Sequence, residues 1–263
     1  MTEKNNIGLV LSGGGARGLA HVGALKVLEE LGLSVEFVAG TSAGALVGAL
    51  YAGGHSANDI LAFFKKAKLF TWHNLTRKKP GLVNMENFIP LFKEYLPDDD
   101  FDALHRKLFV TATDLLKPEG KIFDKGQVIR PVLASAAVPG VFSPIEIDGG
   151  LFVDGGVFNN FPIEPIQQCC PKIIGINVSP LLPMEKTEFK SSLSVLQRSY
   201  RIGVTNACLP KFNRCDVFLS PPELRKITTL GTNHLQNAFD IGYKAASEKA
   251  EVIRQLFEQE LSS

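Results

Sequence analysis

A serine flanked by glycines stands in a pattern that is typical of serine hydrolases. Residues 40–44 read Gly-Thr-Ser-Ala-Gly, which matches the Gly-x-Ser-x-Gly turn that presents a serine hydroxyl between a strand and a helix. Gly40 and Gly44 permit the sharp turn, but the hydroxyl of Ser42 is a weak nucleophile until a base accepts its proton. The motif therefore predicts acyl transfer and requires a base elsewhere in the chain.

A glycine-rich turn earlier in the chain, Ser-Gly-Gly-Gly-Ala-Arg-Gly, admits two interpretations. Gly13, Gly15 and Gly18 satisfy the G-x-G-x-x-G pattern of dinucleotide-binding turns. That interpretation lacks the acidic residue that should end the next strand, and a P-loop would need a lysine where Leu19 stands. Successive backbone N–H groups at a helix start also suit the oxygen that becomes negative in acyl transfer. Adjacent parallel strands would bring this turn beside Ser42, which favours the second interpretation.

The histidines do not supply an obvious base. They are His21, His55, His73, His105 and His234. A hydrolase of Ser-Asp-His order places its histidine late in the chain, and only His234 lies late. For His234 and for His21, which is close to the glycine turn, a structural role is the better interpretation.

Two aspartates precede paired glycines, and they divide into a turn and a candidate base. Asp148 joins two short strand candidates and is typical of a hairpin turn. Asp154 instead ends a strand, and Gly155 and Gly156 after it allow the close backbone approach of a crowded site. An aspartate is ordinarily a poor base, but partial desolvation beside a serine raises its pKa. Asp154 is therefore the better candidate.

The composition limits the classes of partner. Lys+Arg number 28 against Asp+Glu 27, a net charge of +1, so no general attraction to nucleic acid or to anionic membrane is expected. The cysteines have neither zinc-site nor disulfide spacing, which predicts reduced thiols, no metal and no cofactor; they are Cys169, Cys170, Cys208 and Cys215. Apolar runs of signal-peptide or membrane-spanning type are missing from the sequence. We expect a cytoplasmic protein, at most peripheral to a membrane.

Strand-like and helix-like runs alternate, which predicts a single α/β domain over residues 1–263, a three-layer α/β/α sandwich around a mostly parallel sheet. Strands are expected at 7–12, 35–39, 108–113, 121–123, 145–147, 151–153, 172–178 and 216–220. Helices are expected at 19–31, 43–52, 127–137, 193–207 and 237–261. The motifs fall within a core of about 7–180, and about 190–261 supplies a carboxyl-terminal strand and helices.

The three motifs together resemble those of the patatin-like phospholipases, especially the compact bacterial members. In chain order they are Gly13-Gly14-Gly15-Ala16-Arg17-Gly18, Gly40-Thr41-Ser42-Ala43-Gly44 and Asp154-Gly155-Gly156. Two flanking stretches, VLASAAVPGVFSPI and DGGVFNNFP, are also similar to that family, and Ser135 in the first is expected to shape the site wall. The resemblance covers most of residues 7–180 and is weak beyond them.

The resemblance implies a carboxylic ester hydrolase that needs no histidine, in which Ser42 is the nucleophile and Asp154 activates it. It also implies an oxyanion hole made by backbone N–H groups of residues 13–15 and formed or braced with Arg17. The substrate would be a phospholipid, a lysophospholipid or another acyl ester, without metal or nucleic acid. Two alternatives stay open: a nucleotide-binding protein that uses the glycine turn, and a regulatory protein on a patatin fold.

A basic and aromatic segment, residues 62–81, is a candidate for membrane contact. It contains no acid and combines Lys65, Lys66, Lys68, Arg77, Lys78 and Lys79 with Phe63, Phe64, Phe70 and Trp72. Such a mixture suits an anionic lipid surface. An ordinary helix with a basic outer face and buried aromatic side chains explains it equally well.

Overall fold

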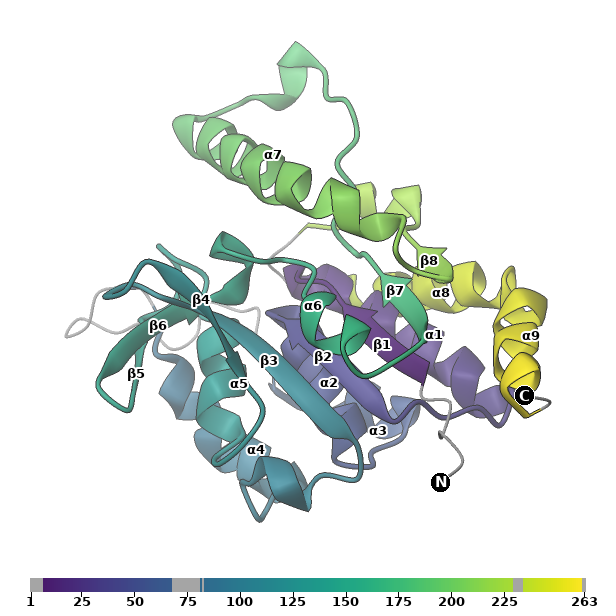
Figure 1. The fold of residues 1–263 in the computed structure, drawn as a ribbon. Coiled ribbons are helices and arrows are strands. Elements are labelled where there is room, and N and C mark those ends of the chain that lie inside the picture. Colours follow the sequence, from purple (N-terminus) through teal and green to yellow (C-terminus); the bar gives the residue numbers. More distant parts are fainter. Residues whose placement is uncertain (1–6, 68–80, 82, 229–233, 262–263) are drawn as a thin grey trace.

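The computed structural model describes residues 7–67, 81, 83–228 and 234–261. Figure 1 shows a twisted central sheet with helices on both of its faces. This architecture confirms the predicted α/β/α sandwich with a mostly parallel sheet.

The described strands form one sheet in the order β5-β6-β3-β2-β1-β7-β8, with β4 paired to β3. The central run from β3 to β8 is parallel, whereas β4, β5 and β6 join by antiparallel pairing. The strands are β1 (Ile7–Leu11), β2 (Phe37–Thr41), β3 (Lys107–Asp114), β4 (Glu119–Phe123), β5 (Ile145–Ile147), β6 (Gly150–Asp154), β7 (Lys172–Ile176) and β8 (Val217–Leu219).

The described helices lie on the faces of the sheet and extend beyond the carboxyl ends of its parallel strands. They are α1 (Leu19–Glu30), α2 (Ala43–Ala52), α3 (Ala57–Ala67), α4 (Ile89–Tyr95), α5 (Ile129–Ser135), α6 (Glu164–Gln167), α7 (Ser192–Phe212), α8 (Leu235–Ser247) and α9 (Ala250–Leu261). Short 3₁₀ helices are η1 (Gly15–Gly18), η2 (Met85–Phe88), η3 (Phe101–Ala103), η4 (Gly155–Val157), η5 (Lys186–Glu188) and η6 (Pro222–Lys226).

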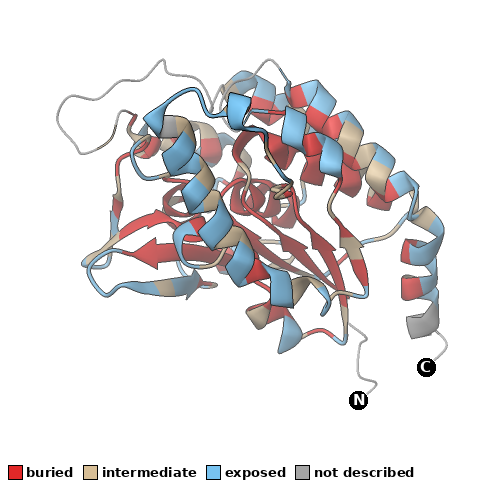
Figure 2. Ribbon diagram, turned by 90° about the horizontal axis from the view of Figure 1, so that it is seen from above, coloured by how far each residue is buried: buried red, intermediate tan, exposed pale blue. Residues whose placement is uncertain are grey.

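Alternating side chains of the central strands fill two hydrophobic cores. In β1, Leu9 and Leu11 belong to the larger core beneath α1, α2 and α8, whereas Val10 belongs to the smaller core that contains Ile166 of α6. All three side chains are fully buried. Figure 2 shows the buried strands inside the molecule and the exposed outer faces of the helices. A strand covered on both faces has this continuous apolar character.

The pairing of β1 with β2 places the two sequence motifs side by side. The strands are parallel, and Leu11 of β1 lies opposite Gly40 of β2. Each strand ends at the same edge of the sheet, so the glycine turn after β1 and Ser42 after β2 meet there. Ligands bind at this edge in open α/β sheets.

Differences from the predicted elements lie mainly outside the motif region. The helix predicted over 237–261 is divided into α8 and α9, and Lys249 between them donates from Nζ to the carbonyl of Phe218 at 3.0 Å. The sequence analysis did not predict α3 or α4. Within the described residues, none of the helices is long and apolar enough to span a bilayer.

Candidate active site

Ser42 occupies a sharp turn between β2 and α2. Its backbone has φ 53° and ψ −123°, a conformation that non-glycine residues rarely adopt. The two motif glycines make this turn possible, because a Cβ on Gly40 would lie 2.5 Å from the carbonyl oxygen of Gly44. A Cβ on Gly44 would lie 2.2 Å from the carbonyl oxygen of Leu11. The start of α2 therefore packs directly against the ends of β2 and β1 only because Gly40 and Gly44 lack side chains.

The hydroxyl of Ser42 is hydrogen bonded to a carboxylate. Ser42 Oγ donates to Oδ2 of Asp154 at 2.6 Å. The two residues are distant in the sequence, but β6 pairs with β3 so that Asp154 lies opposite Ala112. Ser42 is 6% exposed and Asp154 is 5% exposed. A nucleophile and a base within hydrogen-bonding distance form the arrangement that activates a serine.

The environment of Asp154 makes it a stronger base than an ordinary aspartate. Burial raises the pKa of its carboxyl group to about 6, while hydrogen bonds from Ser42 and from the N–H of Gly156 lower it. The Gly156 N–H donates to Oδ1 at 2.7 Å. Gly155 is required for the approach of η4 to β3, because a Cβ there would lie 2.0 Å from the carbonyl oxygen of Thr111.

The glycine turn lies against Ser42. A Cβ on Gly13 would be 3.1 Å from the Cβ of Ser42. The N–H of Gly13 donates to the carbonyl of Asn160 at 3.2 Å, whereas the N–H groups of Gly14 and Gly15 have no acceptor within the described part of the chain. The N–H of Gly13 thus fixes the turn to the segment after Asp154, whereas the N–H groups of Gly14 and Gly15 remain free to donate to another group.

Arg17 contacts the end of another element and forms no hydrogen bond with Ser42 or Asp154. Its Nε donates to the carbonyl of Ile227 at 2.7 Å. The side chain is buried, and burial together with the positive charge of Arg201 lowers its pKa to about 10. Arg17 therefore braces the helix that follows the glycines against the segment after η6.

The described histidines form no hydrogen bond with Ser42 or Asp154. His21 is fully buried, and its Nε2 donates to the carbonyl of Ser12 at 2.8 Å. Burial lowers the pKa of His21 to about 4, so the ring is neutral at physiological pH. His55 contacts the carbonyl of Tyr95, His234 precedes α8, and His73 lies outside the described residues.

Other sequence candidates have structural positions. Asp148 is exposed in a two-residue hairpin between β5 and β6, with φ 50° at Asp148 and 76° at Gly149. Positive φ at both positions is what a type I′ turn requires. Within the residues that the structure describes, His, Cys, Asp and Glu side chains do not gather into a group of three that could hold a metal ion.

A buried serine, Ser135, which was predicted only to shape the site wall, holds the backbone of Ser42 in place. Ser135 Oγ accepts the N–H of Ser42 at 2.8 Å and donates to the carbonyl of Thr111 at 2.6 Å. Ser135 is fully buried at the end of α5. The strained turn is therefore fixed to β3 through a single hydroxyl.

Replacing Ser135 by alanine is expected to lower the free energy of unfolding by about 2–4 kcal/mol, because it leaves two buried backbone groups without partners. It is also expected to slow the labelling of Ser42 by a fluorophosphonate. Urea unfolding and labelling kinetics measure the two effects.

The matched control for that experiment is Ser143→Ala. Ser143 is also fully buried, but its Oγ has no partner within the described residues. Removing such a hydroxyl is close to neutral. Equal effects of the two substitutions on labelling would contradict a positioning role for Ser135.

A tyrosine from a distant helix also lies near the dyad. Tyr200 belongs to α7 and is 42% exposed, and partial burial of its hydroxyl group together with the nearby carboxylate of Asp154 raises the pKa of that group. Figure 1 shows α7 as a long helix above the sheet. No motif marks Tyr200 in the sequence, because its proximity to Asp154 arises only through the path of the chain.

Comparisons with known proteins agree with the geometry. A family described as patatin-like phospholipase matches residues 9–166, more than half of the chain. An uncharacterized NTE family protein of Mycobacterium tuberculosis is 33% identical over 166 residues, which are 61% of this chain and 45% of that protein. Neuropathy target esterase sws of Drosophila melanogaster is 33% identical over 202 residues, 72% of this chain and 14% of that protein.

Another relative and one solved structure extend the comparison. Lysophospholipase NTE1 of Yarrowia lipolytica is 28% identical over 198 residues, 72% of this chain and 14% of that protein. VipD from Legionella pneumophila has a TM-score of 0.58 at 15% identity, covering 95% of this chain and 67% of that chain, which shows similarity of fold alone. This chain spans less than half the length of the sequence relatives it matches.

Proposed function

This chain belongs to the patatin-like phospholipase family, and from that membership and the site geometry we propose that it is a serine lipid acyl hydrolase. The substrate class is an acyl ester, namely a phospholipid or a lysophospholipid. The observation that carries the proposal is the hydrogen bond of 2.6 Å from Ser42 Oγ to the buried carboxylate of Asp154. We further propose that the whole chain forms one catalytic domain.

The reaction begins when Ser42 Oγ attacks the carbonyl carbon of the bound ester and Asp154 accepts the hydroxyl proton. The carbonyl oxygen becomes negative and accepts hydrogen bonds from the N–H groups of Gly14 and Gly15. When the tetrahedral intermediate collapses, the ester C–O bond breaks and Asp154 returns the proton to the leaving alcohol. Water, deprotonated by Asp154, then attacks the acyl-enzyme, the bond between Ser42 Oγ and the acyl carbon breaks, and Asp154 returns the proton to Ser42 Oγ, which releases the fatty acid.

Fluorophosphonate labelling tests this function against nucleotide binding. We expect covalent label on Ser42, identified by mass spectrometry of the digested protein, together with hydrolysis of acyl esters. Gly13, Gly15 and Gly18 would instead support nucleotide binding if NAD or ATP raised the melting temperature and the fluorophosphonate left the protein unlabelled.

Hydrolysis is expected to increase with pH through one ionisation near 6 and to level off above it. Burial raises the pKa of Asp154 to about 6, and only the ionised carboxylate accepts the proton of Ser42. The value of kcat/KM for a short acyl ester, measured from about pH 4 to about pH 8, checks this.

The same profile distinguishes the two buried candidate bases. If His21 were the base, the ionisation would lie near the value of about 4 to which burial lowers its pKa. A value of kcat/KM that does not change between about pH 4 and about pH 8 would contradict an active role for Asp154.

Peripheral membrane contact through residues 62–81 stays a proposal. The described residues of this segment have the contacts expected of an ordinary helix. Phe63 and Phe64 are buried in the core, as in an ordinary helix. Lys65 donates to Gln236, and Lys66 forms an ion pair with Glu94. The six other basic and aromatic members named for the segment all lie outside the described residues: Lys68, Phe70, Trp72, Arg77, Lys78 and Lys79.

A further inference from the structure

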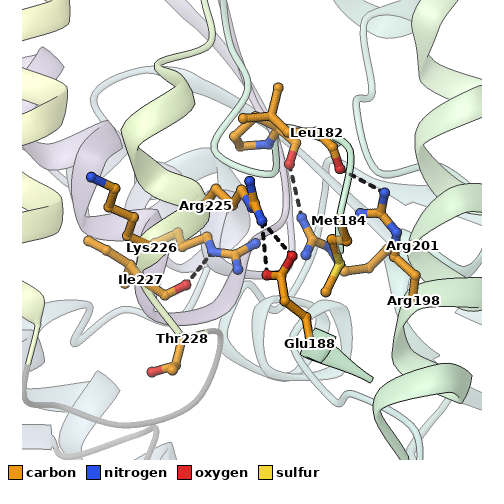
Figure 3. A pocket seen from close by; sticks show the side chains of 11 residues that line it. Leu182, Met184, Glu188, Arg198, Arg201, Arg225, Lys226, Ile227 and Thr228 are labelled. Atoms are coloured by element: carbon orange, nitrogen blue, oxygen red, sulfur yellow. Dashed lines mark hydrogen bonds and ion pairs between the residues drawn. The ribbon is translucent and has the colours of Figure 1, made fainter. Parts of the chain in front are cut away.

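A small pocket lined by cationic side chains lies beside the glycine turn. Figure 3 shows these side chains around one hollow, whose volume is about 190 Å³. The charged residues that line it are Arg17, Arg198, Arg201, Arg225, Lys226 and Glu188. The pocket therefore combines five basic groups with a single carboxylate, in a chain whose net charge is only +1.

The carboxylate is already occupied by one arginine. Arg225 donates from Nη2 to both carboxylate oxygens of Glu188, at 2.9 and 2.8 Å. Arg17, Arg198 and Arg201 form no ion pair within the described residues. Three guanidinium groups thus remain for an anion that enters from outside.

Backbone carbonyls hold these three arginines in place. Arg198 donates to the carbonyl of Leu182 at 2.7 Å, and Arg201 donates to the carbonyl of Pro180 at 3.0 Å. Arg17 donates through Nε to Ile227. A guanidinium has five N–H donors, so each arginine keeps further donors for a ligand. It is unfavourable to place several like charges together in a partly buried pocket. Burial of Arg201 and the positive charge of Arg198 both lower the pKa of Arg201.

The pocket is connected to the catalytic machinery on two sides. Arg17 follows the proposed oxyanion donors in the same turn. Pro180 follows Ser179, whose Oγ donates to the carbonyl of Gly13 at 2.9 Å. In the sequence of α7, Tyr200 stands between Arg198 and Arg201. The charge of Asp154 contributes to raising the pKa of the Tyr200 hydroxyl group. These contacts place the arginines beside the same glycine turn that lies against Ser42.

We propose that this pocket binds the phosphate group of the acyl ester substrate through Arg17, Arg198 and Arg201. The planar donors of arginine match two phosphate oxygens at once. The volume of about 190 Å³ is smaller than the roughly 300–1,000 Å³ of pockets that enclose whole ligands. A pocket of this size can hold the phosphate group but not the acyl chain. This inference rests on the proposed function, because it assigns a substrate class to the same site.

The test compares two substrates with the same acyl chain, a monoacylglycerol and the corresponding monoacylglycerol phosphate. The double variant Arg198→Gln/Arg201→Gln is expected to lower the ratio of kcat/KM for the phosphate ester to that for the neutral ester by roughly 10- to 100-fold. Arg198→Lys/Arg201→Lys keeps the charge but loses the planar donors, so a smaller fall in the ratio is expected.

The matched control removes the same charge elsewhere. Arg214 and Arg254 are exposed, and neither lines the pocket. Arg214→Gln/Arg254→Gln should leave the ratio as in the wild type. Circular dichroism and melting temperature confirm that each variant is folded. An unchanged ratio in Arg198→Gln/Arg201→Gln, or an equal fall in the control, would overturn the proposal.

A second measurement separates a lipid phosphate from a free one. Inorganic phosphate should raise the melting temperature of the wild type and not of Arg198→Gln/Arg201→Gln, and it should compete with the monoacylglycerol phosphate. Stabilisation without competition would indicate a site for free phosphate and would overturn the substrate assignment. If fluorophosphonate does not label Ser42 and neither ester is hydrolysed, the proposed function fails instead, and phosphate binding still tests the pocket.

Discussion

Replacing Ser42 by alanine is expected to lower the rate of ester hydrolysis by roughly 10⁶-fold, as removal of the serine nucleophile does in other serine hydrolases. Alanine keeps the backbone and Cβ but cannot form the acyl-enzyme. The loss should appear in kcat measured with a short acyl ester, and covalent labelling by a fluorophosphonate should disappear.

A comparison with another buried serine makes the result specific. Ser143→Ala should retain both activities, because Ser143 contacts neither Ser42 nor Asp154 through a hydrogen bond within the described residues. Hydrolysis that survived in a folded Ser42→Ala variant would contradict the nucleophile assignment. An unaltered cell phenotype with an inactive Ser42→Ala protein would support the regulatory alternative.

The sequence predicted those parts of the site in which a functional residue stands on a turn with its own residue pattern. A turn at positive φ, such as Ser42, requires small neighbours, and Gly40 and Gly44 mark it in the sequence. Adjacent parallel strands then place the glycine turn beside it, and this was predictable from the strand pattern. The hairpin at Asp148 was predictable for the same reason, because turn residues carry their own conformational signal.

Contacts between distant segments could not be predicted in this way. Ser135 reaches Ser42 from α5, and Tyr200 reaches the neighbourhood of Asp154 from α7. The arginine pocket likewise combines η1, α7 and η6. These residues have ordinary local patterns, so only the folded chain brings them together. The single-domain organisation of residues 1–263 stays a prediction.

The helices that were not predicted differ in the strength of their signals. Ser56 and Asp59 form reciprocal hydrogen bonds at the start of α3, with Ser56 N–H on Asp59 and Asp59 N–H on Ser56 Oγ. The Ser-x-x-Asp spacing resembles a capping box and could have located the helix. The break at Lys249 has no such signal, because neither glycine nor proline stands there.

Asp154→Asn is expected to lower ester hydrolysis by roughly 10²- to 10⁴-fold, the contribution of a general base. Asparagine preserves the shape of the side chain but cannot accept the proton of Ser42. The matched control is Asp148→Asn, which changes the same atoms in an exposed hairpin turn where asparagine also tolerates positive φ. Equal loss of activity in both variants would contradict the assignment of the base.

The same substitution is expected to stabilise the folded protein at neutral pH by about 1–3 kcal/mol. Burial raises the pKa of Asp154 from 3.8 to about 6, so the folded state binds this proton more tightly than the unfolded state does. The resulting cost of ionisation grows with pH between these values, is complete above about 6 and vanishes below about 4. Asparagine removes that cost and still accepts the N–H of Gly156. Urea unfolding should therefore show a gain at about pH 8 and none at about pH 4. If the variant were less stable than the wild type at neutral pH, the ionised carboxylate would stabilise the fold. Ionisation of Asp154 would then carry no free-energy cost in the folded state, and this explanation of its strength as a base would be wrong.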